Sequence, residues 1–249
     1  MTNTRAEPPQ RQPSPRSAEK IAACAACRVR DLGVCAALNQ PELAELAGIM
    51  TEVSYPTGKT LFDEGEPAEA LYNITGGAAR LYKLMPDGRR QITGFLLQGD
   101  LLGLARNGRY TCSAETLGNM RACRYVHRRF DALVERFPDL RRRLHENAVD
   151  ELVEAHTHML LLGRKTAAER VASFLLRLSR RQSRHGFPAQ PVRLPMTRAD
   201  IADYLGLTTE TVSRTVTRLK TQGLIRLRPD SEVELVDELR LAALAGDEL

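Results

Sequence analysis

The chain changes character at Pro138, and this change constrains its fold more than any other feature. Across residues 53–126, short apolar runs are separated by a glycine roughly every ten residues, as at Gly76 and Gly77, which is typical of antiparallel strands joined by turns. Across residues 139–162 there is neither glycine nor proline, and apolar residues recur three or four positions apart, which is typical of a helix. We therefore predict an α+β protein in which an antiparallel β-roll is followed by a long helix.

The predicted helix has a single apolar stripe, formed by Leu140, Leu144, Ala148, Leu152, Ala155, Met159 and Leu162. At 1.5 Å per residue, the helix is expected to be about 35 Å long. Such a stripe can pack against the C-terminal part of the chain or against the same helix of a second copy. The second interpretation makes the first six residues the dimerisation face of a homodimer. The residues alone leave both interpretations open.

Positive charge is concentrated in one part of the chain. The 249 residues carry a formal net charge of +5, yet residues 164–228 alone hold 14 lysines and arginines against four acidic residues. The remainder of the chain is therefore net negative. A basic segment beside an acidic remainder indicates a polyanionic partner, and double-stranded DNA is the partner that we expect.

Two short helices are predicted within the basic segment. Thr197, followed three residues later by Asp200, has the pattern of a capping box and begins the first helix. Gly206 permits a tight turn, after which a second helix is expected over residues 209–222. Two helices joined in this way form a helix-turn-helix. Beside it we expect a small β-wing, from apolar segments at residues 224–227 and 233–236.

The second of these helices carries Glu210, Ser213 and Arg214 on one face, near its N-terminal end. Arg214 can donate two hydrogen bonds to guanine, and Glu210 can accept one from cytosine, so this face has the chemistry for reading base edges. The alternative is a surface ion pair between Glu210 and Arg214. The residues expected to contact DNA are Thr209, Glu210, Ser213, Arg214, Arg218 and Lys220, with Arg218 and Lys220 favouring phosphates.

The first residues and the cysteines indicate a reducing compartment. Residues 1–16 are rich in proline and arginine, and no run approaches the roughly 18 apolar residues of a membrane span. We therefore expect a cytoplasmic protein without membrane attachment, beginning with a disordered tail over residues 1–18. Cytosolic thiols are kept reduced, so the five cysteines are not expected to form disulfides.

Three cysteines lie close together in the sequence, at Cys24, Cys27 and Cys35. A C-x2-C pair with a third thiol eight residues later favours an iron–sulfur cluster, whose fourth ligand would be Cys112 or Cys123. The alternatives are a zinc site, a dithiol redox switch and ordinary buried thiols. No nucleophile or phosphate-binding motif is present in the sequence, so we do not expect an enzyme.

Several segments carry a family resemblance: Gln91-Ile-Thr-Gly-Phe95, Gly99-Asp-Leu-Leu-Gly103, Ala168-Glu-Arg170, Tyr204-Leu-Gly-Leu-Thr208 and Glu210-Thr-Val-Ser-Arg214. They are similar to the branch named for fumarate and nitrate reduction (FNR) within the cyclic-AMP receptor protein (CRP/FNR) superfamily of bacterial transcription regulators. The resemblance covers nearly everything after residue 20. It implies a jelly-roll of the cyclic-nucleotide-binding type, a long dimerisation helix and a C-terminal winged helix-turn-helix.

The resemblance also implies a cofactor. In the FNR branch, three N-terminal cysteines and one cysteine of the roll bind an oxygen-labile [4Fe–4S] cluster, which implies Cys24, Cys27, Cys35 and Cys123 as ligands here, with Cys112 as the alternative fourth ligand. Seven residues separate the second and third cysteines, where the founding pattern has five. The E-x-x-S-R face implies that a homodimer reads a palindromic DNA site.

Two further expectations follow from the resemblance. Members that bind cyclic AMP use an R-S-A segment and a glutamate in a G-E-L turn, whereas this chain has Cys112-Ser113-Ala114 and Gly103-Leu104-Ala105. The arginine and the acid are absent, so we expect no cyclic nucleotide. The family also implies contacts with RNA polymerase, around residues 86–89 and 181–192.

We therefore expect an oxygen-responsive activator of transcription that works in the absence of oxygen. The alternative is a regulator of the same family that senses thiol oxidation or a haem-bound gas, or that zinc stabilises without a cluster. The expected organisation is a disordered tail at 1–18, a cysteine-rich segment at 19–47, the β-roll at 48–138, the dimerisation helix at 139–163 and the winged helix-turn-helix at 164–249.

Overall fold

The computed structural model describes residues 15–246. Of the tail expected over residues 1–18, the first 14 residues therefore lie outside the described residues. Helix α1 (Pro15–Ala25) already begins at Pro15, so the last four residues of the expected tail are helical. Proline suits the first turn of a helix because its missing N–H would have no partner there.

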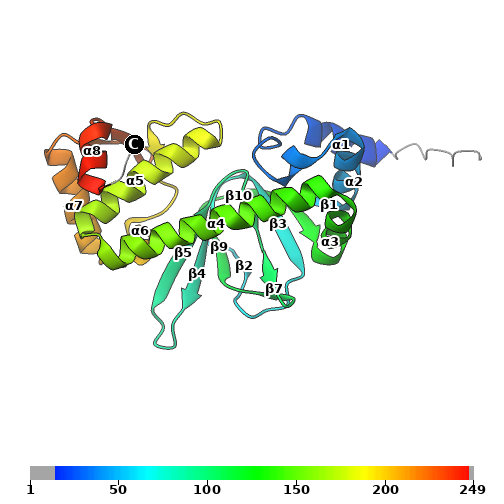
Figure 1. Cartoon of the computed structure of the whole chain (residues 1–249), viewed down its shortest axis with the longest axis horizontal. Coiled ribbons are helices and arrows are strands. Elements are labelled where there is room, and N and C mark those ends of the chain that lie inside the picture. Colours follow the sequence, from blue (N-terminus) through cyan, green and yellow to red (C-terminus); the bar gives the residue numbers. More distant parts are fainter. Residues whose placement is uncertain (1–14, 247–249) are drawn as a thin grey trace, which may run out of the picture.

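A β-roll occupies the middle of the molecule (Figure 1). Its strands are β1 (Met50–Tyr55), β2 (Thr60–Phe62), β3 (Ala70–Gly76), β4 (Ala79–Leu84), β5 (Arg90–Leu96), β6 (Leu101–Leu102), β7 (Ala105–Arg106), β8 (Arg109–Tyr110), β9 (Ser113–Thr116) and β10 (Met120–Val126). One antiparallel sheet has the order β1-β10-β3-β6 and the other β2-β9-β4-β5. Both sheets contribute to one apolar core, with Ile74 from the first and Ala79 from the second. The predicted roll is confirmed.

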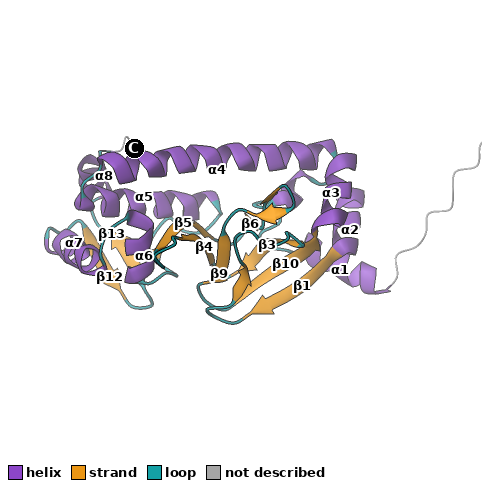
Figure 2. Ribbon diagram, turned by 90° about the horizontal axis from the view of Figure 1, so that it is seen from below, coloured by secondary structure: helices purple, strands orange, loops and turns teal. Residues whose placement is uncertain are grey.

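Short helices cover one end of the roll (Figure 2). They are α1, the 3-10 helix η1 (Val34–Ala37), α2 (Gln40–Ile49) and, after the last strand, α3 (His127–Arg136). A capping box of Asn39 and Glu42 begins α2. Apolar side chains of these elements form a second core, which includes Leu43 from α2, Tyr125 from β10 and Phe130 from α3.

Helix α4 (Pro138–Arg164) runs along the molecule from α3 to the C-terminal domain (Figures 1 and 2). The predicted long helix is confirmed. Leu140 is buried in the second core and Leu144 is half-buried against it, because α4 starts directly after α3. Leu140 therefore belongs to the interior of its own chain, and the part of the predicted stripe that is free for a partner begins at Ala148. No helix among residues 15–246, α4 included, is long and apolar enough to cross a membrane.

The C-terminal domain is a winged helix-turn-helix. Its elements are α5 (Ala167–Arg184), β11 (Val192–Arg193), α6 (Arg198–Leu205), α7 (Thr209–Thr221), β12 (Ile225–Arg228), β13 (Glu232–Leu235) and α8 (Glu238–Ala245). Helix α5 continues to Arg184, so the first four residues of the segment 181–192, where polymerase contacts are expected, are helical. The core of this domain is continuous with Ile92 and Phe95 of the roll, so the two domains share apolar packing.

Candidate DNA interface and cysteine site

The turn between α6 and α7 follows the local signals in the sequence. The Thr197 hydroxyl accepts a hydrogen bond from the Asp200 N–H at 3.1 Å, and the Asp200 carboxylate accepts one from the Thr197 N–H at 2.9 Å. Gly206 ends α6 in the left-handed region, with φ of 61°, which glycine adopts at little cost. Thr208 then caps α7 by accepting a hydrogen bond from the Thr211 N–H at 3.2 Å. The predicted helix-turn-helix is confirmed.

Helix α7 separates a buried face from an exposed one. Its buried apolar residues are Val212, Val216 and Leu219. Glu210, Ser213 and Arg214 are exposed on the opposite side. Among the ion pairs of the described residues, none joins Glu210 to Arg214, and the Arg214 Nη2 atom instead lies 3.5 Å from the Thr211 hydroxyl. Both charged side chains are exposed. The remaining predicted contacts are also exposed: Thr209, Arg218 and Lys220.

Four of the five cysteines come together beside the second core. Cys24 lies on α1, Cys27 follows that helix, Cys35 lies in η1 and Cys123 lies on β10. Cys24, Cys35 and Cys123 all pack against the same apolar residues. The thiols of Cys24, Cys27 and Cys35 each act electrostatically on Cys123, so segments far apart in the sequence converge here.

At the cysteine site, burial disfavours the ionised form of Cys24, Cys35 and Cys123. Burial, reinforced by the neighbouring thiols, raises the pKa of Cys35 to about 12 and that of Cys123 to about 12. Burial and then Cys27 also raise the pKa of Cys24. A positive centre among these sulfur atoms would reverse the effect, because it stabilises thiolates. Without such a centre, these thiols are poor nucleophiles at neutral pH.

Cys112 lies apart from the other four cysteines. It is half-buried in the roll, and its charged neighbours are Lys83, Glu151 and Glu64. Burial raises the pKa of Cys112 as well. The geometry thus groups Cys123, and not Cys112, with the three N-terminal cysteines.

The grouping of the cysteines is looser than a site for a single ion. Among residues 15–246, no three His, Cys, Asp or Glu side chains are close enough together to hold one metal ion.

One contact surface was not visible in the sequence, namely the junction between the roll and α6. Phe95 of β5 contacts Tyr204 of α6, with ring centroids 5.1 Å apart, and Phe174 of α5, at 6.1 Å. Arg80 and Arg90 of the roll also contact acidic side chains of α6, over sequence separations of 110 to 120 residues. Local patterns do not report contacts over such separations.

Comparisons with known proteins agree with this architecture. Two family models match, a cyclic nucleotide-binding domain over residues 52–137 and a Crp-like helix-turn-helix domain over residues 169–244. The nitrogen fixation regulation protein FixK of Bradyrhizobium diazoefficiens is 44% identical over 223 residues, which cover 90% of this chain and 94% of that protein. The transcriptional activator protein FnrL of Cereibacter sphaeroides is 38% identical over 231 residues, covering 90% and 92%. The solved structure of FixK2 from Bradyrhizobium japonicum has a TM-score of 0.74 and 40% identity, covering 81% of this chain and 98% of that one.

A roll, a long helix and a winged helix-turn-helix, together with these relatives, define a DNA-binding regulator of transcription. The chain belongs to the FNR branch of the CRP/FNR superfamily, as the sequence motifs indicated. Its relatives are named as transcriptional activators and regulators.

Proposed function

We propose that this chain is an oxygen-responsive activator of transcription. As a homodimer it binds a palindromic DNA site while Cys24, Cys27, Cys35 and Cys123 hold a [4Fe–4S] cluster. The observation that carries this proposal is the convergence of these four thiols, from three separate elements, at the end of α4.

The donor set fits an iron–sulfur cluster. Four cysteine thiolates are the usual ligands of such a cluster. When bound, such a cluster would supply oxygen-sensitive iron–thiolate bonds. Without it, Cys35 and Cys123 would be neutral in the core, because burial and then the neighbouring thiols raise the pKa of each to about 12.

The cysteine segment contacts the long helix directly, which provides a route for the signal. The 3-10 helix η1, which contains Cys35, packs against α4. The Arg143 Nη2 atom of α4 donates a hydrogen bond to the Leu32 carbonyl oxygen at 3.0 Å. Ligation of Cys35 would order this segment and steady the first turns of α4. We expect that loss of ligation loosens the same contacts.

The exposed part of α4 supports pairing of two chains. The side chains of Leu152 and Met159 are 55% and 59% exposed, and they lie seven residues apart. Ala148 and Ala155, also seven apart, each lie three or four residues from one of them. This spacing is that of a two-stranded coiled coil, in which two positions of each heptad, separated by three and four residues, form the seam. A second copy of α4 would cover these apolar side chains.

Activation also requires RNA polymerase. We propose that the turn at residues 86–89 and the loop at residues 185–192 contact it. The turn is exposed, and beside it Leu84 and Met85 are also exposed. No cyclic nucleotide takes part in this proposal, since Cys112 and Leu104 occupy the positions of the usual arginine and glutamate.

Purification without oxygen, followed by iron and sulfide analysis, tests the cluster. We expect about four iron atoms per chain, in line with a cubane held by four thiolates. Cys123→Ser should lose this iron, whereas the matched control Cys112→Ser should keep it. Stoichiometric zinc without iron, or the Soret band of haem, would contradict the proposal.

A further inference from the structure

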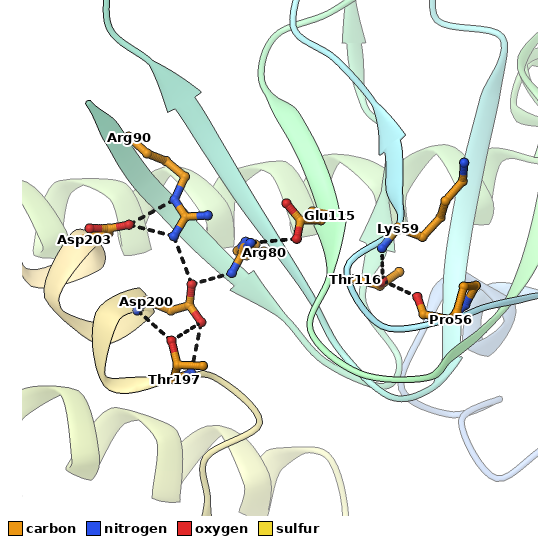
Figure 3. A network of polar contacts seen from close by, with 9 residues as sticks. All are labelled: Pro56, Lys59, Arg80, Arg90, Glu115, Thr116, Thr197, Asp200 and Asp203. Atoms are coloured by element: carbon orange, nitrogen blue, oxygen red, sulfur yellow. Dashed lines mark hydrogen bonds and ion pairs between the residues drawn. The ribbon is translucent and has the colours of Figure 1, made fainter. Parts of the chain in front are cut away.

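The hairpin of β4 and β5 reaches from the roll to α6, the first helix of the helix-turn-helix (Figure 3). Arg90 of this hairpin donates two hydrogen bonds to Asp203. Its Nε atom lies 2.9 Å and its Nη2 atom 2.7 Å from the same carboxylate oxygen. The Nη2 atom also lies 3.1 Å from Asp200. Gln91 adds a hydrogen bond from its side-chain amide to the Asp203 carbonyl oxygen at 2.7 Å.

Asp200 is the central acceptor of this contact. Its carboxylate is only 2% exposed, and it pairs with Arg80 as well as Arg90. The Arg80 guanidinium is held in turn by Glu115 of β9, at 2.7 Å. Arg80 is therefore fixed to the sheet of the roll while it binds α6. We call Arg80, Arg90, Asp200 and Asp203 the hairpin clasp.

Apolar packing beside the hairpin clasp makes this contact stiff. Tyr204 of α6 is 8% exposed and contacts Phe95 of the roll on one side. On another side it stacks on His158 of α4, with ring centroids 4.1 Å apart. Helix α6 is thus tied to the roll and to α4 at once. Removing one partner of a charge pair in such a place leaves the other partner partly buried and unpaired, which is costly.

The hairpin clasp leaves the DNA-reading face open. All its acidic members are on α6, and none of Glu210, Ser213 and Arg214 on α7 takes part in it. These three side chains remain exposed while the clasp is closed. The arrangement is therefore compatible with bound DNA and is not an autoinhibitory cover.

We propose that the hairpin clasp positions the recognition helix. In a dimer on a palindrome, the two copies of α7 must lie about 34 Å apart, one turn of DNA. Arg80 and Arg90 set this separation because they fix α6, and with it α7, relative to the roll and to α4. All four members are positioning residues, since none of them lies on the reading face. The inference rests on the proposed function, because it requires two chains to pair.

The test uses the full chain and the palindromic duplex that the wild-type chain selects from random DNA. Arg90→Gln and Asp203→Asn each remove one side of the clasp and spare the capping box of α6. Each should weaken binding to this duplex about five- to tenfold, and the double variant should bind no more weakly than the weaker-binding single variant. Lys83→Gln is the matched control, because Lys83 is on the same hairpin and pairs with Glu64 of the roll.

The dependence of binding on half-site spacing distinguishes a positioning role of the hairpin clasp from a simple loss of stability. The wild-type chain should bind much more weakly when one base pair is inserted between the half-sites, and the clasp variants should lose most of this penalty. Their affinity for a single half-site should match that of Lys83→Gln, even if an unpaired partner in the clasp lowers their thermal melting. If the variants keep the full spacing penalty, the clasp does not position α7, although the proposed function stands. If the wild-type chain itself shows no spacing penalty, the proposed pairing and the clasp proposal both fail.

Discussion

The two ends of α4 differ in the packing and the charge pairing of the side chains around them. At the C-terminal end, Leu161 is buried in a continuous apolar core and the hairpin clasp matches each acid with an arginine. At the N-terminal end, Leu140 is equally buried, but burial and then the neighbouring thiols disfavour the ionised forms of Cys35 and Cys123. The C-terminal end is held by protein groups alone, whereas the proposed cluster would stabilise thiolates at the N-terminal end. Control by a ligand is therefore expected at the N-terminal end and transmission at the other.

The largest expected effect is on dimerisation, and it comes from a substitution in the part of α4 between its two ends. Leu152→Glu places a charge on the exposed stripe of α4, and burying it against a second copy would be unfavourable. We expect dimerisation to weaken by about 2 to 3 kcal/mol, which is about 100-fold. Sedimentation equilibrium without oxygen measures this. Thr157→Glu, which adds the same charge at an exposed position elsewhere on α4, should leave the dimer intact. Equal behaviour of the two variants would remove α4 from the interface.

Arg214→Ala tests the proposed role of α7 in reading base edges. Loss of a bidentate contact to guanine should cost about 1 to 3 kcal/mol at one base position and relax specificity there. Competition binding with single-base variants of the operator measures this. Lys220→Ala serves for comparison, because a phosphate contact affects all sequences alike and reduces the salt dependence of binding. A uniform loss for Arg214→Ala would make it a phosphate contact too.

Gly99 tests how tightly the N-terminal end is packed. Its φ is +95°, and a Cβ atom there would lie 2.7 Å from the Cβ atom of Leu32, which belongs to the cysteine segment. Gly99→Ala should lower the free energy of unfolding by about 1 to 3 kcal/mol, through backbone strain and the clash. Gly88→Ala is the control, since its φ of +84° brings the same strain but its Cβ would meet nothing within 4 Å. Urea unfolding should therefore show the smaller loss for Gly88→Ala.

The smallest expected effect is on the pH dependence of stability, and it comes from His158, near the C-terminal end of α4. Burial and then the positive charge of Arg177 lower the pKa of His158 to about 4, from an ordinary value of 6.5. Folding therefore favours the neutral ring, and this contribution is present above pH 6.5 and is lost as the pH falls through 4. Thermal melts between pH 7 and pH 4 should fall less steeply for His158→Gln than for the wild-type chain. His156→Gln, two residues away on α4, should retain the wild-type slope.

Local signals predicted most of the fold. Thr197, Gly206 and Thr208 define the helix-turn-helix through capping and a left-handed turn, which depend only on nearby residues. The absence of breakers after Pro138 predicted α4. The sequence did not reveal that Leu140 faces its own chain, because the periodicity of a stripe does not say what covers it.

The candidate sites were less evenly predictable. The exposed face of α7 with Glu210, Ser213 and Arg214 followed from helical spacing, and its role in reading bases stays a prediction. The C-x2-C pattern singled out Cys24 and Cys27. The choice of Cys123 over Cys112 needed the family resemblance, and it stays a prediction. Asp200 was recognised only as part of a capping box, because its partners Arg80 and Arg90 are 120 and 110 residues away in the sequence. Contacts of that kind depend on how the domains pack.

The central claim is that ligation at the cysteine end governs pairing along α4. Sedimentation velocity of the anaerobically purified chain, before and after exposure to air, tests it most directly when iron content is followed in the same samples. We predict a dimer that dissociates to monomers as iron is lost, and a monomer at every stage for Cys123→Ser. A chain that stays dimeric after all of its iron has gone would contradict the account.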